Sequence, residues 1–181
     1  TLKSNAIVGT SSSRRKSQFL KYKPDAEIKD LRGNVPTRID KLRQGNYDAI
    51  LLAKAGVDRL KLDLSEFEEI ILDPTEFVPA PAQGVLGLQI RSEDIELHEI
   101  LQKINFPAVQ KRVKLERQIL NLLDGGCQLP LGVYCDDQDK LYVSYALPGT
   151  LECVYLNYTV TTFEGMAEKV IADLKQLRLG A

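Results

Sequence analysis

The sequence contains a single histidine, His98, and three cysteines that do not occur in Cys-x-x-Cys pairs. This scarcity argues against a zinc site, and the odd number of cysteines argues against a disulfide framework. We therefore expect a reducing, cytoplasmic environment. His98 follows the charged stretch 92–97, which is typical of a solvated helix, and we assign it no chemistry.

The chain also has almost no net charge and no long apolar run. The formal net charge is -1, so the composition gives no general attraction to nucleic acid or to acidic membranes. No apolar run approaches the length of a membrane span, and no signal peptide is recognisable. The chain does not start with methionine and leads almost at once into an apolar strand, which suggests a piece of a longer protein.

The first part of the chain alternates short apolar strands with helical patterns, which is typical of a parallel sheet with helices on both faces. The expected strands are 6–10, 26–31, 47–53 and 68–73, and the expected helices are 11–22, 35–44 and 55–60. The predicted fold class is α/β, a doubly wound domain like those of periplasmic binding proteins. Ligands of such sheets bind at the carboxyl ends of the strands.

The pattern changes after residue 76. A segment rich in Pro, Ala and Gly ends in an expected strand at 85–90, and helical patterns follow at 93–104 and 107–123. Three strand-like runs (131–135, 140–147 and 153–161) precede a final helical pattern at 162–179. This order predicts a small α+β domain with a three-stranded antiparallel sheet covered by helices, beginning near residue 107.

Arginines follow three successive strands of the first part. Arg14 and Arg15 come after the first strand, Arg32 and Arg38 after the second, and Arg59 after the third. Because parallel strands end at the same rim, these side chains are expected to line one cleft. Ser12 and its neighbours begin a helix there, whose free N–H groups favour an anion. The arrangement indicates carboxylate binding.

The loop Gly125-Gly126-Cys127 places one thiol between two glycines and a Leu-Pro pair that stops the preceding helix. An accessible thiol suits a covalent attachment point or a nucleophile. An alternative interpretation of the same residues is a helix C-cap followed by a small buried residue. Cys135 and Cys153 lie in strand-like runs and are expected to be structural.

Five stretches together resemble the porphobilinogen deaminase (hydroxymethylbilane synthase) family, over nearly the whole chain but only the later part of the family's length. They are VGTSSSRR (8–15), LRGNVPTR (31–38), YDAILLAKAGVDRL (47–60), PAPAQGVLGLQIR (79–91) and LLDGGCQLPLG (122–132). The resemblance implies a transferase of tetrapyrrole (haem and chlorophyll) biosynthesis. It joins four porphobilinogen units into hydroxymethylbilane with release of ammonia.

The resemblance also implies a dipyrromethane cofactor on Cys127 through a thioether. The implied cofactor-binding residues are Ser12, Arg14, Arg15, Arg32, Gln83 and Gly84, and the implied substrate-binding residues are Arg14, Arg15, Arg32, Arg38 and Arg59. Residues 1–76 would be the family's second domain, 77–106 a crossing segment that belongs to a mostly missing first domain, and 107–181 the third domain. The expected partner is porphobilinogen, with no nucleic acid, no membrane and a monomeric state.

The family's catalytic aspartate would precede Thr1, so no catalytic residue is expected in this chain and the chain alone should be inactive. One alternative is a stand-alone anion-binding sensor domain of periplasmic-binding-protein type, which leaves the glycine-flanked cysteine unexplained. The other is a thiol hydrolase, which would need a histidine better placed than His98.

Overall fold

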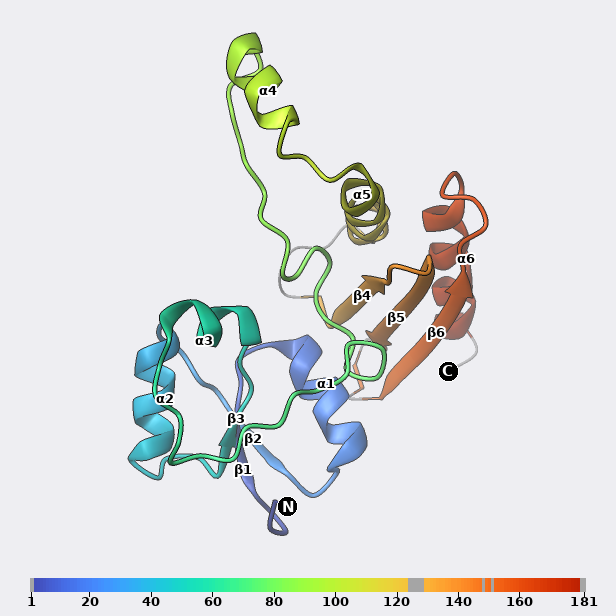
Figure 1. Cartoon of the computed structure of the whole chain (residues 1–181). Helices are drawn as coiled ribbons and strands as arrows, with labels where there is room; N and C mark the ends of the chain where they lie inside the picture. Colours follow the sequence, from blue (N-terminus) through green and yellow to red (C-terminus); the bar gives the residue numbers. More distant parts are fainter. Residues whose placement is uncertain (1, 124–128, 148, 151, 180–181) are drawn as a thin grey trace.

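The computed structural model describes residues 2–123, 129–147, 149–150 and 152–179. The chain forms two units, each built on its own three-stranded sheet. An extended segment and a projecting arm connect the two sheets along the chain (Figure 1). The mixed α/β class expected from the sequence is confirmed.

The first sheet consists of β1 (Ile7–Gly9), β2 (Glu27–Lys29) and β3 (Ala49–Ile50), which are parallel and lie in the order β2-β1-β3. The connection through α1 (Ser13–Tyr22) runs from the central strand to one edge. The connection through α2 (Val35–Arg43) runs back to the other edge. Right-handed crossovers in opposite directions place their helices on opposite faces, as Figure 1 shows for α1 and α2. The short helix α3 (Lys54–Leu60) follows β3.

Both long helices of this unit start at side-chain caps that the sequence encodes. The Ser12 hydroxyl accepts a hydrogen bond from the Arg15 backbone N–H, and the Asn34 side chain accepts one from the Thr37 backbone N–H. Pro36 lies in the first turn of α2, where it removes an N–H that has no partner within the helix. These caps fix the helix starts at the carboxyl ends of β1 and β2.

Two expected strands, 68–73 and 85–90, are absent from the sheets of the described residues. The interpretation was wrong because an apolar run becomes a strand only when a neighbouring strand pairs with its backbone. Here the side chains are left open to solvent: Ile70 is 65% exposed, Ile71 68% and Leu86 85%.

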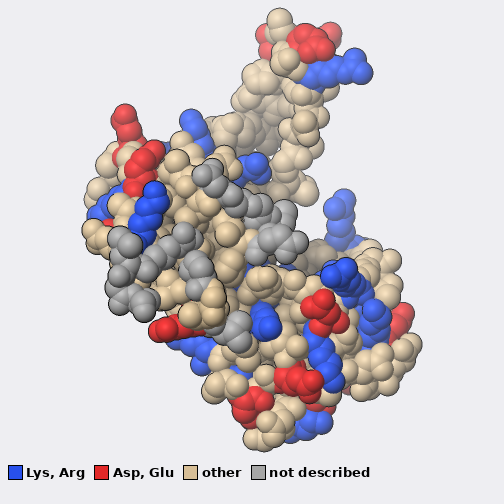
Figure 2. Space-filling model, turned by 180° about the vertical axis from the view of Figure 1, so that it is seen from behind, with Lys and Arg blue, Asp and Glu red and all other residues tan. Residues whose placement is uncertain are grey.

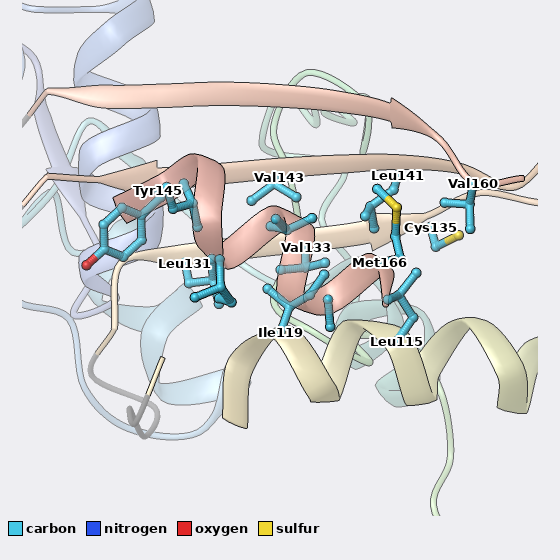
Figure 3. Packing of buried hydrophobic residues seen from close by; sticks show 14 of the residues in the cluster. Leu115, Ile119, Leu131, Val133, Cys135, Leu141, Val143, Tyr145, Val160 and Met166 are labelled. Carbon is cyan, nitrogen blue, oxygen red and sulfur yellow. The ribbon is translucent and has the colours of Figure 1, made fainter. Parts of the chain in front are cut away.

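The second sheet is antiparallel and is formed by β4 (Leu131–Cys135), β5 (Lys140–Ala146) and β6 (Cys153–Thr159), in that order. The alternation of side chains sends Leu131, Val133 and Cys135 to one face, against α5 (Pro107–Leu122) and α6 (Met166–Leu179). Figure 3 shows Leu115 and Ile119 of α5 pointing into this core. The expected three-stranded sheet covered by helices is confirmed.

Residues 85–106 form an arm that carries α4 (Ile95–Gln102). The arm projects from the body, with uncharged residues along its stem and charged side chains gathered at its tip (Figure 2). Several large apolar side chains of the arm are exposed, including Leu86, Leu88, Ile95, Ile100, Ile104 and Phe106. Among the described residues, we find no helix that combines the length and the apolar character needed to cross a bilayer.

The two units are joined by direct contacts at the segment 78–83. Val133 of β4 donates a backbone hydrogen bond to the Pro79 carbonyl oxygen (2.9 Å), and α1 packs against β5 and β6. The Glu116 carboxylate, on α5, accepts from the Ala82 N–H (2.6 Å) and the Cys135 N–H (2.9 Å). Burial raises the pKa of Glu116, and these two hydrogen bonds partly oppose the shift.

Gly132 permits this close approach of the segment to the sheet. A Cβ atom at this position would lie 2.6 Å from the Val78 carbonyl oxygen and 3.0 Å from the Val78 Cβ. We expect Gly132→Ala to lower the free energy of unfolding by roughly 2–3 kcal/mol, because backbone must move to relieve the overlap. Urea denaturation measures the change. Gly87→Ala is the control, since a Cβ there meets nothing within 4 Å, and equal stability of the two variants would contradict the argument.

Candidate functional site

The turn between β1 and α1 is held by its own hydroxyl groups. The Ser11 hydroxyl donates to the Leu31 carbonyl oxygen and accepts from the Leu31 N–H, both at 3.0 Å, so it ties this turn to the end of β2. Thr10 accepts from the Ser12 N–H (3.2 Å), and Ser12 caps α1. The turn is thus a rigid platform for the residues that follow it.

Arg14 is the most buried arginine of this platform, with 6% of its surface exposed. Its Nη1 donates to the Val78 carbonyl oxygen (2.7 Å) and its Nη2 to the Gln83 side-chain oxygen (3.2 Å). Burial lowers the pKa of Arg14 to about 10, and the positive charge of Arg15 adds to the shift. The guanidinium remains charged at neutral pH.

Arg15 is half-buried beside it and donates from Nη1 to the Leu51 carbonyl oxygen, just past β3 (2.9 Å). Burial lowers the pKa of Arg15, and the positive charge of Arg38 contributes. Arg38 itself is half-buried and donates from Nε to the Gly33 carbonyl oxygen (2.8 Å). Three guanidinium groups from the ends of β1 and β2 therefore form one positive cluster.

A cavity of about 270 Å³ adjoins this cluster. Arg14, Arg15 and Gln83 form part of its lining, together with Lys54, Glu68 and Glu69. The rest of the lining is mainly apolar and comes from α2, the end of β3, and the segment 64–79. Lys54 is already neutralised, because its ammonium pairs with Asp58 (2.7 Å) and Glu69 (3.2 Å).

Within the described part of the chain, no carboxylate forms an ion pair with Arg14 or Arg15. A buried cation beside a half-buried one that repels it is costly unless an anion compensates the two charges. Their remaining N–H groups suit bidentate binding of a carboxylate. The arrangement is therefore chemically an anion site beside an apolar cavity.

The other arginines named by the sequence lie outside the lining of this cavity. The Arg32 side chain is 83% exposed and lies 3.7 Å from the Asp30 carboxylate. Arg59 is exposed in the last turn of α3. Gly84 adopts a φ of +86°, a left-handed conformation that favours glycine, and follows Gln83 on the surface. Arg38 acts on the site only electrostatically, because its positive charge contributes to the lowered pKa of Arg15.

Cys127 lies outside the described residues, so its role remains a prediction. The other two cysteines lie in strands, as the sequence predicts. Cys135 is buried in β4, where burial raises the pKa of its thiol to about 12. Burial also raises the pKa of Cys153 in β6. Both thiols are therefore poor nucleophiles at neutral pH.

Two residues that the sequence reasoning did not single out hold the site together. Gln18 lies one helical turn after Arg14 on α1, and the i,i+4 spacing could have indicated a shared partner. Glu116 is a charged residue between Val113 and Ile119 on the apolar stripe of α5, which is the signal of a buried carboxylate. Among the described residues, no three His, Cys, Asp or Glu side chains gather as metal ligands do.

Two models of known protein families match the chain. Residues 1–99 match the family model described as porphobilinogen deaminase, dipyromethane cofactor binding domain. Residues 110–176 match the model for the porphobilinogen deaminase C-terminal domain.

Curated relatives named porphobilinogen deaminase come from several bacteria. The protein from Maridesulfovibrio salexigens is 47% identical over 143 residues, which cover 77% of this chain and 46% of the relative. The protein from Halalkalibacterium halodurans is 43% identical over 150 residues, which cover 82% of this chain and 48% of the relative. The protein from Syntrophobacter fumaroxidans is 46% identical over 125 residues, which cover 69% of this chain and 40% of the relative. The chain thus spans about half the length of the curated relatives it matches.

Proposed function

Because this chain belongs to the porphobilinogen deaminase family, we propose that it is part of a transferase that joins four porphobilinogen units into hydroxymethylbilane with release of ammonia. The observation that carries the proposal is the pair of a buried Arg14 and a half-buried Arg15, which have no carboxylate partner in the described residues. Porphobilinogen carries acetate and propionate groups, which are the anions that such a pair binds.

The residues present fit a dipyrromethane cofactor. Its carboxylates match the guanidinium groups of Arg14 and Arg15, and its pyrrole rings match the apolar lining of the adjacent cavity. Cys127 would hold it through a thioether, with Ser12, Arg14, Arg15, Arg32, Gln83 and Gly84 around it. When bound, the dipyrromethane supplies the primer for the growing chain.

The residues of this chain bind the carboxylates of the ligand and orient them. Arg14 and Arg15 hold carboxylates at a fixed place because their other N–H groups are anchored on Val78, Gln83 and Leu51. Arg32, Arg38 and Arg59 would hold carboxylates of the longer product chain. Their greater exposure and lighter anchoring suit a ligand that changes length.

We propose that residues 1–76 form a periplasmic-binding-protein-like domain, that 77–106 cross toward a further domain, and that 107–181 form the cofactor-carrying domain. The opposite-face placement of α1 and α2 supports the first assignment. The exposed apolar side chains of the arm support the second, because such a surface requires a partner. We also propose a monomeric cytoplasmic protein that uses a small-molecule substrate and binds neither nucleic acid nor membrane. The net charge of -1 is consistent with that proposal.

Arg14→Leu and Arg15→Leu in the complete protein test the site. We expect each to reduce cofactor assembly or chain extension roughly 10- to 150-fold, since a charge-assisted hydrogen bond contributes about 1.5–3 kcal/mol. Steady-state turnover of porphobilinogen and the intact mass of the purified protein measure the two steps. Circular dichroism and thermal melting confirm that the variants fold.

Arg43→Leu is the matched control. Arg43 is exposed and already paired with Asp40 and Glu66, both at 2.6 Å, so it has no role in binding an added anion. We expect its removal to leave turnover within about twofold, as for most surface ion pairs. Wild-type turnover of both Arg14→Leu and Arg15→Leu would count against the proposed site.

A further inference from the structure

Gln18 is a fully buried amide whose two ends are both used. Its exposed fraction is 0%. The Nε2 group donates to the Val78 carbonyl oxygen (2.9 Å), and the Oε1 atom accepts from the Val78 N–H (2.7 Å). The side chain therefore pairs with the whole backbone of Val78, a residue sixty positions away in the segment that joins the two units.

The same Val78 carbonyl oxygen is the main anchor of Arg14. Gln18 Nε2 and Arg14 Nη1 donate to this one acceptor, from positions one helical turn apart on α1. The second anchor of Arg14, the Gln83 side chain, lies five residues further along the same segment. The direction of the guanidinium thus depends on where residues 78–83 lie. Val133 and Glu116 hold Pro79 and Ala82 of this segment, and Gln18 holds Val78, the residue that accepts from Arg14.

Only an amide meets both requirements at this position. A leucine would fill the space but leave the buried Val78 N–H without a partner, at the cost of an unmade hydrogen bond. A glutamate would accept from the Val78 N–H but could not donate to the carbonyl. A third contact fixes the orientation of the amide, because the Tyr155 hydroxyl of β6 donates to Gln18 Oε1 (3.4 Å).

We propose that Gln18 is a positioning residue for carboxylate binding: by holding the Val78 backbone, it keeps the Arg14 guanidinium directed at the anion site. The proposal rests on the proposed function in one respect, that Arg14 binds carboxylates of the pyrrole ligand. It assigns to Gln18 no contact with the ligand. Loss of Gln18 acts on the ligand through Arg14 alone.

The first test needs no ligand and uses the 181-residue chain. A guanidinium held by two acceptors rotates slowly, so the Arg14 Nη–H groups are expected to give resolved NMR signals, assigned by their loss in Arg14→Leu. In Gln18→Leu these signals should broaden or merge. In Gln176→Leu, the control on the exposed side of α6, they should not change. Unchanged Arg14 signals in folded Gln18→Leu would overturn the proposal.

The second test is a double-mutant cycle with porphobilinogen as the probe, measured by calorimetry on the same chain. Gln18→Leu should weaken binding about tenfold, which is the effect of losing one well-placed charged hydrogen bond. In the Arg14→Leu background, Gln18→Leu should cause no further loss of affinity, although its effect on the melting temperature should persist. Equal losses in both backgrounds would show a general structural role and overturn the proposal.

A third variant covers the case in which Gln18→Leu does not fold. Gln18→Glu has nearly the same shape and keeps the acceptor for the Val78 N–H. It places a carboxylate beside Arg14, so porphobilinogen affinity should fall by more than tenfold, and affinity within twofold of wild type would overturn the proposal. If the wild-type chain itself does not bind porphobilinogen, the proposed function of the site fails, while the Arg14 signals still decide the role of Gln18.

Discussion

Cys127→Ala in the complete protein is expected to yield a polypeptide without cofactor and with turnover reduced on the order of 10³-fold or more, as when an essential covalent group is removed. The reason is that no other cysteine is suited to the attachment. Cys135 is buried with a pKa raised to about 12, and burial also raises the pKa of Cys153. The intact mass, compared with that of the wild-type holoenzyme, reports the missing group directly.

Cys135→Ala and Cys153→Ala are the matched controls. Both are expected to retain the added mass and most of the activity, with stability lowered modestly for the buried Cys135. Peptide mapping of the wild-type protein locates the modification. A cofactor found on Cys135 or Cys153 would show that the assignment to the glycine-flanked loop is wrong.

The 181-residue chain by itself is expected to show no turnover of porphobilinogen above background. Chain extension requires a carboxylate that stabilises positive charge on the pyrrole nitrogens. The family resemblance implies that an aspartate before Thr1 would supply it. Several acids of the described residues are already engaged: Asp40 pairs with Arg43, Asp48 pairs with Lys3 and accepts from the Ile7 N–H, and Glu69 of the cavity lining pairs with Lys54.

Absorbance of uroporphyrin after oxidation of the reaction mixture measures this turnover, with the complete protein as the positive control. We expect Cys127 of the isolated chain to carry no added mass, because cofactor assembly uses the same chemistry. Product formation by the chain alone would contradict this expectation and show that an acid within residues 1–181 performs the catalysis.

Local signals in the sequence predicted the elements that depend on local physics. Ser12 and Asn34 mark the helix starts because their side chains cap them, and three strand-like runs predicted β4, β5 and β6. The strand expected at 68–73 failed for a different reason. The hydrophobicity of Ile70 and Ile71 indicates that they favour burial, but it does not indicate which strand would pair with their backbone. None of the described residues forms such a neighbouring strand.

The candidate site was predictable in part. Strand-end positions indicated that Arg14 and Arg15 share a rim, and the structure places both at one cavity with Gln83. The burial of Arg14 was not predictable, because it depends on Val78, which is distant in sequence and is placed by Gln18 and by the second sheet. Arg32 and Arg59 look equivalent to Arg14 in sequence, yet they are exposed because no such segment covers them.

The contacts that join the two units also protect the second sheet from unwanted association. β4 is an outer strand, and outer strands offer unpaired N–H groups on which another chain can assemble. The Val133 N–H is already taken by Pro79, and the Cys135 N–H by Glu116. A shortened chain that starts after residue 84 would lack Pro79, so the Val133 N–H would have lost its acceptor. It would also lack Ala82, so one carboxylate oxygen of Glu116 would be left without its hydrogen bond. The segment 78–82 therefore covers the exposed edge of β4. A shortened protein that contains only the C-terminal unit should retain this segment if aggregation is to be avoided.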